Sequence, residues 1–161
     1  MWDSSEGLEL MLQASLAEQQ GDISKALELI DRAIKLAENA RSTEHVLQWK
    51  THRALLLTDT TGDFSDLITI TQETLDFYTR QKDILRQLES LINLAGLMVK
   101  VGDKSRALRY LDDAENLLSA LTPSDVAEIA KSSKGSAAIH IDMFLGLRSA
   151  EINRIRQYLA G

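Results

Sequence analysis

The side chains that could do chemistry in this chain are few and widely separated. The three histidines are His45, His52 and His140, and the sequence contains no cysteine. His45 and His52 are seven residues apart and would share one helix face, but no pair of carboxylates at ligand spacing completes a metal site around them. His140 and Asp142 would point from different faces of a helix. Neither arrangement predicts a metal centre or a catalytic dyad.

Sequence motifs for nucleotide or acyl chemistry are missing as well. The chain has no Gly-rich phosphate loop, no nucleophile elbow and no dinucleotide-binding fingerprint. Its acidic pair, Asp112 and Asp113, is expected on an exposed helix face, where carboxylates are solvated. We therefore expect a protein that is not an enzyme, with no catalytic residue, no cofactor and no metal.

Composition places the chain among ordinary folded proteins. It has 161 residues, of which 44% are hydrophobic and 26% charged, with a single proline. That balance is typical of one globular domain and argues against disorder. The first residues show no signal-peptide pattern, and no apolar run reaches the roughly 18 residues of a membrane span. Together with the absence of cysteine, this predicts a cytoplasmic protein with no membrane partner.

Charge is distributed unevenly along the chain. The net charge is −6, and Lys+Arg minus Asp+Glu is 3−8 for residues 1–40, 4−6 for 41–80, 6−6 for 81–120 and 5−4 for 121–161. An acidic chain without a basic stripe is a poor match to nucleic acid, because phosphate neutralisation supplies most of that affinity. The gradient could orient a partner or a second copy, or it reflects an ordinary solvated surface.

A recurring tetrapeptide indicates the turns between the helices that position these residues. Gly-Asp-x-Ser occurs at Gly21–Ser24, Gly62–Ser65 and Gly102–Ser105, and a degenerate copy, GLRS, occurs at Gly146–Ser149. The glycines are 41, 40 and 44 residues apart (62−21, 102−62, 146−102). Each lies between two stretches with apolar residues at helical spacing. A period near forty with a turn in its middle predicts stacked helix–turn–helix units.

Apolar residues at three- and four-residue steps predict about eight helices between these turns. The first helix begins at a cap among Asp3, Ser4 and Ser5 and ends at Gly21, and the second ends near Asn39. The next four are expected at Ser42 to about Thr60, Ser65 to about Tyr78, about Asp83 to Val101, and Ser105 to about Ala120. The seventh begins at Thr122-Pro123 and kinks or breaks at Ser132–Gly135, and the eighth follows Gly146.

One segment tests the all-helical interpretation. Residues Asp66–Thr71 alternate like a strand and are rich in β-branched side chains, which favour sheets. Leu67, Ile70 and Tyr78 nevertheless keep helical spacing, and an isolated strand here would have no partner. We therefore expect a helix.

Small residues recur at matched offsets around the mid-unit turns and carry a family resemblance. Ala14, Ala26 and Ala33 surround Gly21 at the same intervals at which Ala95, Ala107 and Ala114 surround Gly102. Small side chains let two helix axes approach closely. This spacing resembles the tetratricopeptide repeat, in a variety longer than the usual 34 residues. The pattern is weaker in the second unit and weakest in the fourth, as expected for a repeat that caps a stack.

The resemblance implies an architecture and a mode of action. It implies an all-α solenoid of about eight antiparallel helices in a right-handed superhelix, forming one domain over residues 1–161 with units at about 5–40, 43–80, 82–120 and 122–159. The first helices of such units line a concave groove that binds a peptide or helix of a partner. Carried over unit by unit, the groove positions are Met11, Ser15 and Gln19, then Trp49, His52 and Leu56, then Ile92, Gly96 and Lys100, and finally His140, Met143 and Phe144. The carboxylate clamp of the chaperone-binding members does not carry over, because Met11 and Ser15 replace its lysine and asparagine.

Two functions from different classes follow from this interpretation. In the first, the chain is an adaptor or scaffold that holds a partner protein in its groove. In the second, it is a self-associating or regulatory module that uses its end helices for homodimerisation or interdomain packing, through an amphipathic stripe of Ile152, Ile155, Tyr158 and Leu159. The same stripe would also suit a capping helix folded onto its neighbour. A pocket for a small ligand is a third and weaker alternative.

Overall fold

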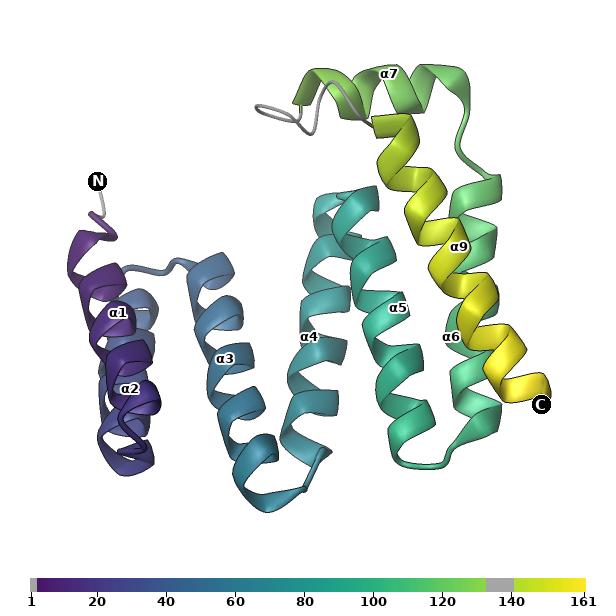
Figure 1. Cartoon of the computed structure of the whole chain (residues 1–161). Helices are drawn as coiled ribbons and strands as arrows, with labels where there is room; N and C mark the ends of the chain where they lie inside the picture. The colour runs from purple at the N-terminus through teal and green to yellow at the C-terminus, as the bar shows by residue number, and fades with distance from the viewer. Residues whose placement is uncertain (1–2, 133–140) are drawn as a thin grey trace. The chain divides into compact units, whose positions relative to one another are not determined.

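The computed structural model describes residues 3–132 and 141–161, without the side chains of Ser132, Ile141, Asp142 and Phe144. Its helices in chain order are α1 (Ser5–Gln19), α2 (Ile23–Asn39), α3 (Thr43–Thr61), α4 (Ser65–Gln81), α5 (Ile84–Lys100), α6 (Lys104–Ser119), α7 (Pro123–Ser132) and α9 (Ile141–Ala160) (Figure 1). No strand occurs in the described ranges, which confirms the all-α class.

The predicted boundaries hold for the middle of the chain and are wrong near its end. The observed α3, α5 and α6 begin and end within one residue of the expected positions. The turn expected at Gly146, by contrast, does not exist, because α9 runs through this glycine without interruption. Gly146 lies in an ordinary helical conformation, whereas Gly21, Gly62 and Gly102 have φ near +75° (78°, 73° and 78°). The break expected at Ser132–Gly135 lies mostly outside the described residues.

The β-branched segment is helical, as predicted, and the hydroxyl groups of its threonines are bonded within the helix. Thr69 Oγ1 donates to the carbonyl of Ser65 at 3.0 Å, and Thr71 Oγ1 donates to that of Leu67 at 2.6 Å. Bonds of this kind satisfy the hydroxyl groups within the helix. Leu67, Ile70 and Thr71 are buried, so tertiary packing decides the conformation against local β-propensity.

The ends of α1 and α5 share one hydrogen-bond pattern, which explains two of the Gly-Asp pairs. Gly62 ends α3 differently, because its N–H donates to the carbonyl of Thr58. At Gly21, whose left-handed backbone ends α1, the N–H of Gly21 donates to the carbonyl of Glu18 and the N–H of Asp22 donates to that of Ala17. This is the Schellman motif. The Asp22 carboxylate then accepts from the N–H of Lys25 and caps α2. The same arrangement recurs at Gly102-Asp103.

Two further Schellman turns lie between the glycine turns and use non-glycine residues. Arg41 and Lys82 have φ of 55° and 57°, and they end α2 and α4. Left-handed turns therefore occur at residues 21, 41, 62, 82 and 102, about every 20 residues. The sequence predicts only the three turns at glycines, because Arg and Lys give no signal for a positive φ.

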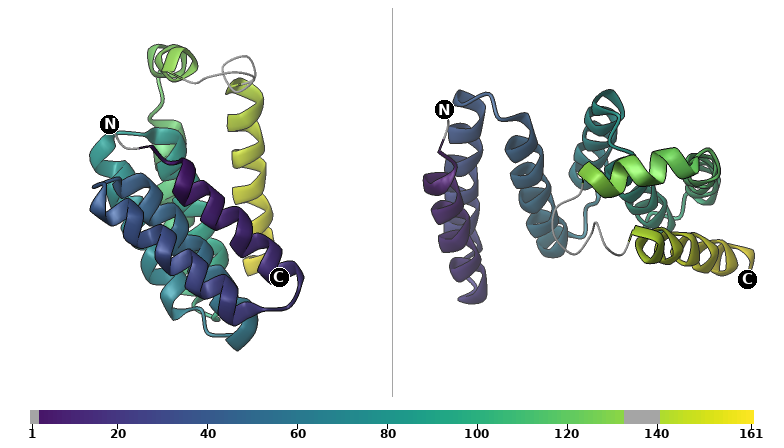
Figure 2. Two further views of the ribbon diagram at one scale, coloured as in Figure 1. Left: turned by 90° about the vertical axis from the view of Figure 1, so that its left-hand side faces the viewer. Right: turned by 90° about the horizontal axis from the view of Figure 1, so that it is seen from above.

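The described residues divide into two compact units, Met1–Glu73 and Thr74–Gly161. In the first unit α2 packs against both α1 and α3 (Figures 1 and 2). The predicted close-approach residues Ala14, Ala26 and Ala33 are fully buried between these helices. With no side chain beyond Cβ, they let the larger Ile30 fill the core between the helix axes.

In the second unit α5 pairs with α6, and α9 packs against both helices. Leu88, Leu111 and Ile152, one from each helix, are almost completely buried at the centre. The α7 helix contacts α9 and runs crosswise to α5 and α6 (Figures 1 and 2). The α5–α6–α9 packing positions the candidate site of this unit.

Candidate functional site

An apolar hollow opens between α5 and α9 in the second unit. It has a volume of about 320 Å³ and is lined by Gly96, Val99, Lys100, Arg154, Ile155 and Tyr158. We call these six residues the α5–α9 hollow. They follow helical steps of one, three and four residues, so each helix contributes one continuous strip of surface.

Gly96 leaves the α5 wall of the hollow open. No heavy atom lies within 4 Å of the position that a Cβ on Gly96 would occupy. One turn earlier on α5, Ile92 is buried in the core cluster that also contains Ile152 of α9. A glycine inside a helix costs about 0.5–1 kcal/mol relative to alanine. The chain bears this cost at the position where the hollow is open.

Two cations flank the apolar walls of the hollow. The guanidinium of Arg154 is 4.0 Å from Glu151, one turn earlier on α9, and its side chain is largely exposed. Lys100 is the last residue of α5, where the helix dipole favours a positive charge. Val99, Ile155 and the ring of Tyr158 supply the apolar surface. The hollow can therefore hold an apolar side chain whose neighbours are acidic.

Residues predicted for two separate purposes meet in this hollow. Gly96 and Lys100 were expected in a partner-binding groove, whereas Ile155 and Tyr158 were expected in a self-association stripe. Tyr158 is 74% exposed, and Ile152 of the same stripe is buried in the core. Leu159 is half-buried against that core. The stripe is thus divided between a packed side and a free side of α9.

In the first unit, the predicted groove residues are mostly structural. Trp49 and Leu56 of α3 are buried in the core, and Met11 of α1 packs against it. His52 Nε2 lies 2.6 Å from Glu18 Oε1, which links α3 to α1. Gln19 is exposed and Ser15 half-buried. In the fourth predicted unit, His140 lies outside the described residues.

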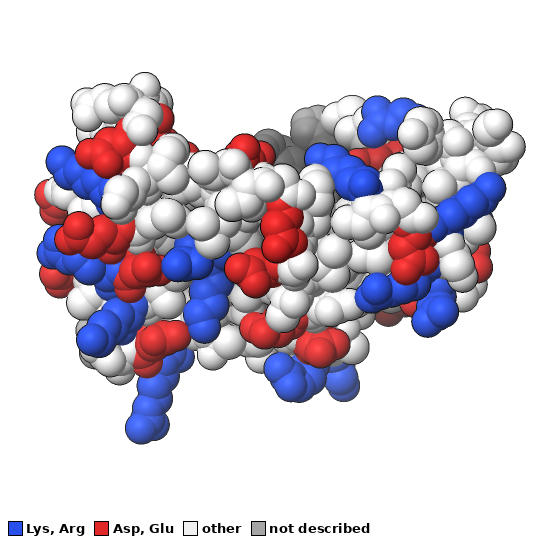
Figure 3. All heavy atoms as spheres, turned by 90° about the horizontal axis from the view of Figure 1, so that it is seen from below, with Lys and Arg blue, Asp and Glu red and all other residues white. Residues whose placement is uncertain are grey.

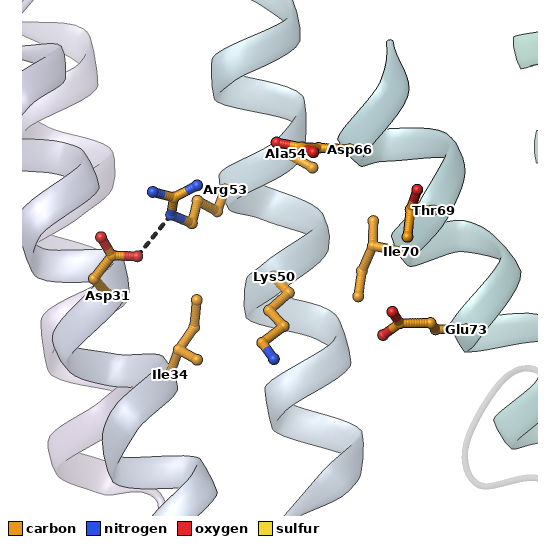
Figure 4. Close-up of a pocket in the computed structure, with 9 residues that line it drawn as sticks. All are labelled: Asp31, Ile34, Lys50, Arg53, Ala54, Asp66, Thr69, Ile70 and Glu73. Carbon is orange, nitrogen blue, oxygen red and sulfur yellow. Dashed lines mark hydrogen bonds and ion pairs between the residues drawn. The ribbon is translucent and has the colours of Figure 1, made fainter.

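A second hollow, in the first unit, was not predicted. It has a volume of about 340 Å³ and lies among α2, α3 and α4 (Figure 4). Its lining is Asp31 and Ile34 of α2, Lys50, Arg53 and Ala54 of α3, and Asp66, Thr69, Ile70 and Glu73 of α4. We call it the charged hollow. Its residues come from three separate segments, and no spacing in the sequence relates one segment to another.

The cations of the charged hollow are already bonded to carboxylates of the same unit. Arg53 Nε donates to Asp31 Oδ1 at 2.6 Å, as the dashed line in Figure 4 shows. Lys50 Nζ lies 3.3 Å from Glu38 Oε1. These pairs connect α3 to α2, so the charges of this hollow serve packing. The α5–α9 hollow is the stronger candidate, because binding pockets are mainly apolar with a few placed polar groups.

The remaining chemistry of the described residues is structural. Of the described histidines, His52 bonds Glu18, and His45 Nδ1 lies 2.8 Å from Ser42 Oγ at the start of α3. Among the residues that the structure describes, no three His, Asp or Glu side chains are grouped so that they could hold a metal ion. None of the described helices combines the length and the apolar character needed to cross a membrane.

Charges of both signs are mixed over the face drawn in Figure 3. Lys and Arg alternate with Asp and Glu over the face drawn in Figure 3, and the described residues of that face form no continuous basic strip. Comparisons with protein-family models, with curated proteins and with solved structures found no match to the sequence. The function is therefore inferred from the geometry alone.

Proposed function

We propose that this chain is a protein-interaction module of the tetratricopeptide type, an adaptor or scaffold that binds a peptide or helix of a partner protein. The repeated turn chemistry supports this proposal: five left-handed helix ends follow one another about every 20 residues. Paired helices with buried alanines at matched offsets, α1–α2 and α5–α6, support it as well. Repeats of this kind present a surface and do not carry a reaction centre.

The α5–α9 hollow is the observation on which the proposal rests. It is an open, apolar space at the surface beside Gly96, and it is flanked by Lys100 and Arg154. An apolar anchor entering such a space is the usual centre of a protein interface, and flanking charges set orientation. We infer that the bound segment carries a leucine or an aromatic residue beside Asp or Glu. The absence of cysteine fits a reducing compartment, and we propose that the module acts in the cytoplasm.

Peptide selection with two matched glycine variants tests the proposal. A random 12-residue peptide library is selected on the wild-type chain, and the enriched peptides are titrated against Gly96→Leu and Gly146→Leu. Both changes replace an uncrowded helical glycine, but only the first fills the hollow. We expect enrichment of acidic peptides with one apolar anchor, and at least a tenfold loss of affinity in Gly96→Leu alone. No enrichment, or equal binding to both variants, would contradict the proposal.

Self-association is the second candidate function. The observation that favours it is the position of the exposed large apolar side chains. Six of the eight in the described residues lie on α1 and α9: Leu8, Leu12, Leu16, Met143, Leu147 and Tyr158. The helices between them bury their large apolar residues far more completely.

A further inference from the structure

The first helix of the chain has an apolar face that no described element covers. Leu8, Leu12 and Leu16 of α1 are 53%, 64% and 50% exposed. At 100° per residue they fall within an arc of about 80° on the side opposite the buried Ala14. A row of three exposed leucines on one helix is an unusual feature for a face that meets only water.

The last helix has a face of the same kind. Met143 and Leu147 of α9 are 59% and 62% exposed, and Arg154 and Tyr158 continue the row. These four residues fall within an arc of about 60° opposite the buried Ile152. Unlike the row of α1, this row contains a cation, Arg154, and it ends beside Lys100 at the α5–α9 hollow.

The charges of the two helices are complementary. The α1 helix has Glu6, Glu9 and Glu18 and no basic residue, a net charge of −3 (0−3). The α9 helix has three arginines against one Asp and one Glu, a net charge of +1 (3−2). Arg148 and Arg156 of α9 are bonded to carboxylates of their own unit. The charges beside the two faces are therefore Glu9, next to the leucine row of α1, and Arg154, within the row of α9, and their opposite signs favour α1 beside α9.

We propose that copies of this chain associate through two unlike faces, with the leucine face of α1 in one copy docked on the Met143–Tyr158 face of α9 in another. The contact is heterologous, because the two faces are different surfaces of the same chain. After one contact the pair keeps one α1 face and one α9 face open, and a further copy can dock on either. The α9 face shares Arg154 and Tyr158 with the α5–α9 hollow, so the decisive test uses changes at Leu12 and Leu147, which do not line the hollow and should leave peptide binding intact.

Two single-face variants give the decisive test. Leu12→Glu removes the α1 face and Leu147→Glu removes the α9 face, while Leu55→Glu changes an exposed leucine of α3 as a control. Mass is measured by analytical ultracentrifugation over a wide concentration range, with circular dichroism to confirm folding. We expect the wild type and Leu55→Glu to grow past the dimer with concentration. Leu12→Glu and Leu147→Glu should each stay monomeric.

Mixing the two single-face variants separates the proposal from a symmetric dimer. The intact α9 face of Leu12→Glu and the intact α1 face of Leu147→Glu should form a one-to-one complex that grows no further. A symmetric α1–α1 contact would leave Leu147→Glu dimeric by itself, and a symmetric α9–α9 contact would leave Leu12→Glu dimeric. Either result overturns the proposal, and so does a wild type that stays monomeric throughout.

Charge exchange provides a second, independent readout at low salt. Glu9→Lys alone and Arg154→Glu alone should each weaken association, because each places like charges across the contact. An equimolar mixture should restore it, since the α1 face of Glu9→Lys then meets the α9 face of Arg154→Glu. Association that is unchanged by either variant would contradict the proposed pairing of faces.

Discussion

Gly7 of α1 lies against the indole ring of Trp49 in α3. A Cβ placed on Gly7 would overlap with Cη2 of that ring, whose side chain is only 2% exposed. We therefore expect Gly7→Ala to destabilise the first unit by about 1–3 kcal/mol, the usual cost of overpacking. Urea denaturation measures this change. Gly96→Ala, at an uncrowded helical glycine, is the control and should be neutral or stabilising; equal effects at both positions would exclude the close contact.

Truncation of Trp49 should lower stability as well. The side chain fills the core between α1 and α3, where it also contacts the ring of His45 at a centroid distance of 5.3 Å. Trp49→Ala should cost about 3–5 kcal/mol, whereas Trp49→Phe should cost less because part of the ring volume remains. Urea denaturation of the two variants gives the comparison. A Trp49→Ala variant as stable as the wild type would show that this ring contributes to a binding surface instead.

The contrast between Trp49 and Gly21 shows how far sequence reasoning reaches. Local signals predict the turn at Gly21, because Gly21 and the capping Asp22 bond only to residues within a few positions in the sequence. Burial of Trp49 depends on Gly7, which is 42 residues away (49−7), and a single sequence gives no sign of that pairing. The α5–α9 hollow was missed for the same reason. Gly96 and Tyr158 were expected at two separate surfaces, and their meeting in one hollow depends on how α9 packs.

The false turn at Gly146 illustrates the converse error. The motif GLRS lacks the aspartate that caps the next helix in the first and third copies. Without a capping residue, a glycine carries little information, since it is tolerated inside a helix at a cost of about 1 kcal/mol. The missing aspartate was the signal that could have prevented the error.

Alanine substitution of two glycines should therefore give opposite results. Gly102 has a φ of 78°, so Gly102→Ala forces an L-residue into the left-handed region and should cost about 1–2 kcal/mol. Gly146 lies inside α9 with no heavy atom near its missing Cβ, so Gly146→Ala should stabilise by about 0.5–1 kcal/mol. Thermal unfolding followed by circular dichroism measures both. Destabilisation by Gly146→Ala would support the turn that the sequence suggested.

Acid titration should distinguish two capping carboxylates. The hydroxyl of Ser65 is the larger cause that lowers the pKa of Asp63, and its backbone N–H is the second. For Asp125 the order is reversed, because the backbone N–H of Thr122 lowers its pKa more than the hydroxyl does. Ser65→Ala should therefore raise the pKa of Asp63 more than Thr122→Val raises that of Asp125. Carboxyl NMR titration measures both shifts.

The sign of the associated pH dependence follows from these directions. Both carboxyls have a pKa lowered from 3.8, so the stability that they contribute is present above that value. It is lost as the pH falls through the lowered pKa of the folded state. Removing either hydroxyl should thus leave stability at low pH unchanged and reduce it slightly near neutrality. A variant that loses stability only in acid would contradict this assignment.

Arg156 should hold α9 to α6. Its guanidinium donates to Glu115 at 3.1 and 2.8 Å and also pairs with Asp112, and these hydrogen bonds raise the pKa of Arg156, with Asp112 the larger cause. A guanidinium that bonds one carboxylate with two nitrogens has favourable geometry. Because both carboxylates are substantially exposed, we expect a contribution of about 1 kcal/mol or less. Arg156→Gln should therefore speed amide hydrogen exchange in α9 before that in α5 or α6. Arg154→Gln, on the exposed side of the same helix, is the matched control and should leave exchange unchanged. If both variants exchanged like the wild type, the core around Ile152 alone would account for the docking of α9.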